Sequence, residues 1–145
     1  MTNNGKLSEE LFEKKILLDD PQGHLYRFED YAQVNFGRQT TSKIVQSKPA
    51  DYLLTKHGHT SYVEVKSTID SRFPFKNIKR GQWRAGTLQT RAGGDYWVYI
   101  HFLTAKNWYK VPFRLLLDHP MKSLAEKDIK EFIVEEWSGC VSSKN

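Results

Sequence analysis

Two strand-length runs joined by a short turn, residues 51–67, restrict the possible folds most strongly. DYLLT and SYVEVKS are rich in β-branched and aromatic residues, and the intervening KHGHT contains a glycine. This pattern predicts an antiparallel hairpin. Side chains two apart on a strand share a face, so Glu64 and Lys66 point to one face of the strand and Val63 and Val65 to the other. The charged face is either ordinary solvated surface or half of an active site.

The rest of the chain predicts an α/β fold with a small mixed sheet flanked by helices. The expected elements are helices over 7–18, 78–91 and 123–137, and strands over 25–28, 95–104 and 108–116. Ser8 is the expected N-cap of the first helix, and Ser123 with Glu126 forms a capping box for the last. Pro112 cannot donate to a ladder, which makes the last strand an edge strand.

The chain of 145 residues has the length of one domain, which we expect to span 1–145. Residues 1–5 and 139–145 are expected to be frayed tails, and the polar, basic segment 37–48 a mobile loop. No apolar run is long enough for a transmembrane helix, and no secretory signal is visible.

The formal net charge is +5. It favours a polyanionic partner, nucleic acid first, and is equally compatible with a mildly basic enzyme. Cys140 is the single cysteine, so no internal disulfide can form, and the sequence is compatible with a reducing cytoplasm.

Asp51 begins the strand that pairs with Glu64 and Lys66 through the hairpin. Antiparallel pairing can therefore gather two carboxylates and one ammonium at one end of the hairpin. Two carboxylates suit a hard cation such as Mg²⁺, which lowers the pKa of a bound water and neutralises charge on a phosphodiester. An adjacent lysine can orient that water or stabilise developing negative charge.

These residues and the segment after them resemble a known family. PADYLL, YVEVKST and FPFKNIKRGQWRAG together resemble the PD-(D/E)xK nuclease superfamily, and within it the RecU-type Holliday junction resolvases. The similarity covers roughly residues 49–101, although Ala50 separates Pro49 from Asp51. It implies a restriction-endonuclease-like core. Because the chain is short for the cellular enzymes, we expect a trimmed relative, from a phage or another mobile element.

The resemblance also implies roles for individual residues. Asp51 and Glu64 become ligands of Mg²⁺, for which Mn²⁺ substitutes, Lys66 becomes the catalytic lysine, and Gln82 supports the water or the metal. No organic cofactor is expected.

The family often adds a glutamate from the first helix. Glu9, Glu10 and Glu13 compete for that role, and we choose Glu13 because it flanks the apolar stripe of Phe12 and Ile16.

Basic residues suited to contacting DNA phosphates occur in the loop and around the second helix. They are Arg38, Lys43, Lys48, Lys76, Lys79, Arg80 and Arg84. Phe73 and Phe75 either belong to the core or act as a wedge at a branch point.

The function we expect is that of a metal-dependent, structure-selective endonuclease that cuts four-way DNA junctions in recombination and repair. A homodimer is implied, since symmetric cutting of a junction needs two sites. The expected location is the cytoplasm, that of the host for a phage protein, with no membrane partner. The alternatives are a restriction-like or repair nuclease acting on duplex or flapped DNA, and a branched-DNA-binding module without catalysis.

Overall fold

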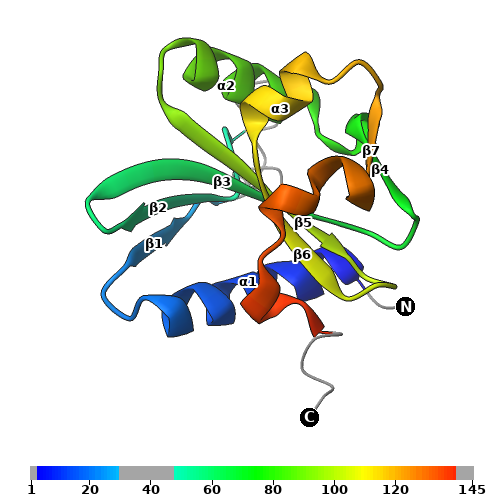
Figure 1. The fold of residues 1–145 in the computed structure, drawn as a ribbon. Helices are drawn as coiled ribbons and strands as arrows, with labels where there is room; N and C mark the ends of the chain where they lie inside the picture. Colours follow the sequence, from blue (N-terminus) through cyan, green and yellow to red (C-terminus); the bar gives the residue numbers. More distant parts are fainter. Residues whose placement is uncertain (1–2, 30–47, 140–145) are drawn as a thin grey trace, which may run out of the picture.

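Residues 3–29 and 48–139 are described in the computed structural model of the chain (Figure 1). Arg38, Lys43, Cys140 and nearly all of the predicted basic loop lie outside these residues. The described part contains a five-stranded mixed sheet with helices on both faces, which confirms the predicted α/β class.

The main sheet has the strand order β1-β2-β3-β5-β6. Its strands are β1 (His24–Arg27), β2 (Tyr52–Lys56), β3 (His59–Thr68), β5 (Asp95–Phe102) and β6 (Asn107–Pro112). β3 and β5 run parallel, whereas the other neighbouring pairs are antiparallel. A parallel pair needs a crossover connection, and helix α2 (Arg80–Arg91) provides it.

The predicted hairpin is confirmed. β2 and β3 pair antiparallel from Lys56 opposite His59 to Tyr52 opposite Val63. His57, with φ of 52°, and Gly58, with φ of 81°, form the turn between them. Positive φ at both central residues matches the twist of the flanking strands, which explains why a glycine stands here.

Each face of the sheet has its own apolar core. α1 (Asn4–Asp19) covers one face, where Phe12 packs against side chains that include Val63. α2 and α3 (Phe113–Asp118) lie on the other face, where Phe113 is buried. Figure 1 shows the two groups of helices on opposite sides of the sheet. Most residues of β3 and β5 are therefore buried, on both faces of the sheet.

The first helix begins earlier than predicted. Its N-cap is Asn3, whose side-chain oxygen accepts a hydrogen bond from the Lys6 backbone N at 3.1 Å, so the expected tail over 1–5 is shorter. Ser8 is not the N-cap. It is buried inside the helix, and its hydroxyl lies 2.9 Å from Nδ1 of His101.

The predicted terminal helix over 123–137 is absent. Ser123–Ala125 forms strand β7, which pairs with β4 (Arg72–Pro74). Two 3₁₀ helices follow, Glu126–Phe132 and Glu135–Trp137.

Tertiary contacts explain why the capping box of Ser123 and Glu126 does not form. Arg72 donates from Nε to the Ser123 hydroxyl at 2.7 Å, and from Nη2 to its carbonyl at 3.1 Å. The Glu126 carboxylate accepts a hydrogen bond from the Tyr109 hydroxyl at 2.6 Å. Both side chains of the box are therefore engaged by other parts of the fold, which outweigh local helix propensity.

The predicted strand over 108–116 is confirmed only in its first half. β6 is an edge strand of the main sheet and ends at Pro112, and α3 begins at the next residue. Among the described residues, no helix is both long and apolar enough to span a membrane.

Candidate active site

A pocket of about 310 Å³ lies where the first turns of α1 and α2 meet the start of β2 and the second half of β3. Four of the five residues predicted to be catalytic line it: Asp51, Glu64, Lys66 and Gln82. Glu9 and Lys48 line it as well. Residues far apart along the chain therefore meet at one place.

The hairpin register brings Asp51 to this pocket. Its backbone N donates to the carbonyl of Val63 at 3.1 Å, which extends the ladder by one residue beyond β2. Its carboxylate Oδ2 accepts a hydrogen bond from the backbone N of Val65 at 2.8 Å. Asp51 is thus fixed against the strand that carries Glu64, as the antiparallel pairing predicted.

Glu64 lies on a buried face, not on a solvated one. Its side chain is 1% exposed, and Oε2 lies 3.1 Å from Nζ of Lys66. Its other oxygen, Oε1, has no hydrogen-bond partner in the part of the chain described. Burial, followed by the nearby charge of Asp51, raises the pKa of Glu64 to about 8, although Lys66 opposes the shift.

A second lysine occupies the pocket. Lys48, which we expected in a basic loop, places Nζ 3.3 Å from Oδ1 of Asp51, and its side chain is largely buried. Each of the two acids, Asp51 and Glu64, therefore has one ammonium beside it. The spacing of three residues between Lys48 and Asp51 is a local signal that was available in the sequence.

The glutamates of α1 have separate environments. Glu9 lines the pocket, and its Oε1 accepts a hydrogen bond from Nη2 of Arg27 at 2.8 Å. Glu13, chosen from the sequence, is not among the pocket residues; its Oε2 accepts from the Tyr52 hydroxyl at 2.6 Å and from Nη1 of Arg27 at 2.9 Å. Glu10 is exposed. Arg27 on β1, which the sequence did not single out, therefore links Glu9 and Glu13.

Burial and the charge of Asp51 raise the pKa of Glu9, whereas Arg27 and then Lys48 lower it. Glu9 is thus an acid that lines the pocket near Asp51, and the guanidinium of Arg27 holds its carboxylate.

Gln82 closes the pocket from the side of α2. It is buried, and its side-chain oxygen accepts a hydrogen bond from the backbone N of Lys79 at 3.0 Å. The oxygen is therefore engaged in capping the helix, and the amide NH₂ is the part of the side chain that is suited to donate toward the pocket.

The predicted phosphate-contacting residues divide between two places. Lys79 lines the pocket of Asp51 and Glu64, whereas Lys76, Arg80 and Arg84 line a separate groove beside it. Phe75 lies in that groove, and Phe73 is fully buried in the core.

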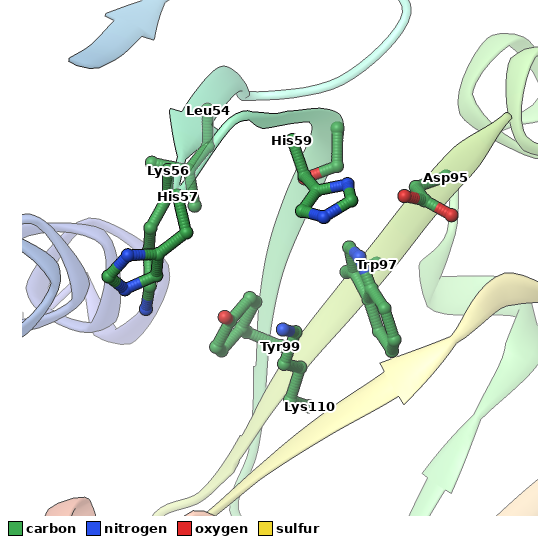
Figure 2. Close-up of a pocket in the computed structure, with 9 residues that line it drawn as sticks. Leu54, Lys56, His57, His59, Asp95, Trp97, Tyr99 and Lys110 are labelled. Atoms are coloured by element: carbon green, nitrogen blue, oxygen red, sulfur yellow. The ribbon is translucent and has the colours of Figure 1, made fainter. Parts of the chain in front are cut away.

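Another hollow, of about 270 Å³, lies near the hairpin turn (Figure 2). Lys110 places Nζ 4.2 Å from the centre of the Trp97 ring there, and His57 of the turn and His59 at the start of β3 point in different directions. Within residues 3–29 and 48–139, no three side chains of His, Cys, Asp or Glu converge to hold an ion by themselves.

The pocket of Asp51 and Glu64 nevertheless fits a hard divalent cation. Mg²⁺ keeps several waters and is commonly bound through only one or two carboxylates. Asp51 and Glu64 provide that pair, and Glu64 Oε1 is a buried oxygen that has no hydrogen-bond partner among residues 3–29 and 48–139. A cation at this position would satisfy that oxygen.

Comparison with known proteins identifies the family of the chain and proteins of similar fold. The family model described as RecU, Recombination protein U, matches residues 28–142. Hjc of Archaeoglobus fulgidus, described as a Holliday junction resolvase from an archaeal hyperthermophile, has a similar structure. The TM-score is 0.55 at 14% identity, over 94% of this chain and 97% of that one. No curated protein matches the sequence.

The α/β fold is therefore one that resolvase nucleases have. The chain belongs to the RecU family, which its sequence motifs resembled. It is accordingly a Holliday junction resolvase, an endonuclease of DNA recombination, in a family that uses divalent metal ions.

Proposed function

We propose that this resolvase cuts four-way DNA junctions at the pocket of Asp51 and Glu64, with Mg²⁺ as its cofactor. One observation supports this assignment above the others: Glu64 Oε1 is buried beside Asp51 without a hydrogen-bond partner among the described residues. A buried carboxylate is costly unless it is paired or coordinates a cation. Lys66 pairs with only one of its two oxygens.

The surrounding side chains have distinct roles in this proposal. When bound, the cation supplies charge neutralisation at the scissile phosphate and a more acidic water. Lys66 Nζ, held 3.1 Å from Glu64, orients the attacking water or stabilises negative charge in the transition state. The Val65 backbone N–H fixes the orientation of Asp51, and the Gln82 amide donates toward the water or the phosphate.

The first-helix acid is Glu9 in this proposal. It lines the pocket and is held by Arg27. The Glu13 carboxylate instead accepts hydrogen bonds from Tyr52 and Arg27. Glu13 then holds Arg27 in place and contributes to the site indirectly, through the contact between Arg27 and Glu9.

Branched DNA is the substrate, and the basic groove residues contact its phosphates. We propose that the active form is a homodimer, because two related strands of a junction must be cut symmetrically. Lys48 contributes from within the catalytic pocket, beside Asp51, where its ammonium can contact the scissile phosphate.

A gel assay with a labelled immobile junction, with and without Mg²⁺, tests the function. We expect paired symmetric incisions with Mg²⁺ and none in EDTA. Asp51→Asn and Lys66→Ala should lower the cutting rate at least ~100-fold while junction binding in EDTA changes little. A panel of fork, flap and duplex DNAs serves as the substrate control.

Two outcomes would contradict the proposal. Equal cutting of flaps or plain duplex would indicate a repair or restriction-like nuclease. Junction binding without any cutting in Mg²⁺ or Mn²⁺ would indicate a binding module without catalysis.

A further inference from the structure

The groove beside the catalytic pocket has an apolar floor and a volume of about 750 Å³. Phe75 and Trp83 are its aromatic residues, with ring centres 5.8 Å apart and ring planes inclined by 38°. Trp83 also packs edge-on against the buried Phe113 at 5.0 Å. The indole is thus held by packing on one side, and part of it remains available to the groove.

The rim of the groove is strongly basic. Lys76, Arg80, Arg84 and Lys122 line it. None of these four forms an ion pair with a carboxylate within residues 3–29 and 48–139. Four uncompensated cations around an apolar floor favour an occupant that is both anionic and aromatic.

This combination argues for a nucleic-acid base over other occupants. A second copy that presented the same face would bring four cations against four cations in an isologous contact. An apolar peptide would leave the rim charges unused. A nucleobase stacks on aromatic rings and carries a phosphate on each side, which suits both parts of the groove.

The groove lies next to the catalytic pocket, because neighbouring residues of one segment line the two hollows. Trp83 on α2 follows Gln82 directly, and Gln82 lines the catalytic pocket. Lys76 lines the groove while the adjacent Asn77 lines the catalytic pocket. The segment 74–84 therefore separates the two hollows, so a strand that passes over it can occupy both.

We propose that this groove receives one unpaired nucleobase from the branch point, stacked on Trp83 and Phe75. The inference rests on the proposed function, because it takes branched DNA as the substrate. Stacking between successive base pairs is interrupted where the arms of a junction meet, so extruding one base costs less there than inside a continuous duplex. The groove thereby contributes to selection of branched over continuous duplex DNA.

A thermodynamic cycle between protein and DNA tests the stacking. Junctions that carry a single abasic site at each branch-point position in turn are titrated in EDTA against wild-type protein and Trp83→Leu. At one position, we expect the abasic site to weaken wild-type binding about 5- to 100-fold. Trp83→Leu should lose the same factor on the intact junction and nothing further at that abasic position.

Controls separate stacking from folding and charge. Trp83→Phe should retain most of the affinity, and thermal unfolding checks that each variant folds. Lys122→Gln on the rim should weaken binding and reduce its salt dependence, whereas Lys130→Gln, an exposed lysine away from the groove, should not.

The inference is overturned if wild-type protein is indifferent to abasic sites at every branch-point position, or if Trp83→Leu weakens intact and abasic junctions equally. It is also overturned if Trp83→Leu changes the oligomeric state, because the groove would then hold a second copy. Failure of the proposed function would look different: wild-type protein itself would neither prefer nor cut junctions.

Discussion

At the scale of single residues, the unusual feature is an acid buried in the sheet next to another acid. Glu64 is 1% exposed, and burial raises its pKa to about 8. Because the pKa is higher in the folded than in the unfolded chain, the protonated form stabilises folding. That stability is complete below the ordinary value of 4.5 and is lost as pH rises through about 8.

The first prediction concerns stability against pH without metal. The free energy of unfolding should fall by roughly 1–3 kcal/mol between pH 5.5 and 8.5, and Glu64→Gln should remove most of this fall. Saturating Mg²⁺ should restore stability of the wild-type protein at pH 8.5, since the cation replaces the proton. Urea unfolding measures the free energy for the wild-type protein, for Glu64→Gln and for the wild-type protein with Mg²⁺.

Glu10→Gln is the matched control, because Glu10 is exposed on α1. It should keep the wild-type dependence on pH. Parallel curves for wild-type protein and Glu64→Gln would show that Glu64 is not the titrating group.

The second prediction concerns Arg27, which donates from separate nitrogens to Glu9 and Glu13. Glu9 lines the pocket beside the pair of Asp51 and Glu64, and removing a residue that orients groups around a metal site typically lowers metal affinity 10- to 100-fold. Arg27→Gln should therefore weaken Mn²⁺ binding by about that factor, measured by calorimetry without DNA. Arg27→Lys keeps the positive charge but loses the planar guanidinium that donates to both glutamates at once, so it should restore Mn²⁺ affinity only in part.

A loss of thermal stability in Arg27→Gln without any change in Mn²⁺ affinity would assign Arg27 a structural role only. Tyr52 and Glu13, the other partners of Arg27, are not among the residues that line the pocket.

At the scale of elements, α2 must approach the sheet closely for Gln82 to reach the pocket. Gly86 lies one turn after Gln82, and a Cβ there would lie 2.6 Å from the ring of Phe113. That ring is fixed by contacts with Trp83 at 5.0 Å and Tyr96 at 5.2 Å. The glycine is therefore needed for packing of α2 against α3.

The third prediction is that Gly86→Ala destabilises the protein by about 1–3 kcal/mol, as overpacking does, despite the better helix propensity of alanine. Gly5→Ala in α1 is the comparison, because the nearest atom to its Cβ is 3.5 Å away. Denaturant midpoints decide between them. Equal midpoints would mean that the Phe113 ring can move aside at little cost.

The elements that carry the site were predictable where the signal is local. The hairpin follows from period-two alternation and the glycine turn, and its register alone brings Asp51 to the strand of Glu64. The burial of Glu64 was not predictable, since it depends on β5, which pairs with β3, and on α2, whose Gln82 lines the same pocket, and both come from distant parts of the chain.

The choice among the α1 glutamates shows the same limit. Helical spacing places Glu9 and Glu13 on one face and cannot rank them. Their ranking depends on Arg27 and Tyr52, which reach them across 14 to 39 residues of chain. The helix predicted over 123–137 is wrong for a similar reason, because Arg72 forms a hydrogen bond with Ser123 from 51 residues away.

At the scale of the whole molecule, the proposed dimer makes a prediction about strand cutting. A mixed dimer of wild-type protein and Asp51→Asn has one working site, so it should nick a cruciform plasmid, whereas the wild-type dimer should linearise it. Gel separation of nicked and linear plasmid measures this. Linearisation by the mixed dimer at the wild-type rate would show that one protomer cuts both strands.

The central claim is that Asp51 and Glu64 bind one divalent cation together, and the most direct test is a crystal grown with Mn²⁺. We expect an anomalous peak roughly 2.1–2.3 Å from an oxygen of each carboxylate, with Glu64 Oε1 as one of the ligands. A peak that touches neither residue, in crystals of protein that cuts junctions with Mn²⁺, would contradict the account.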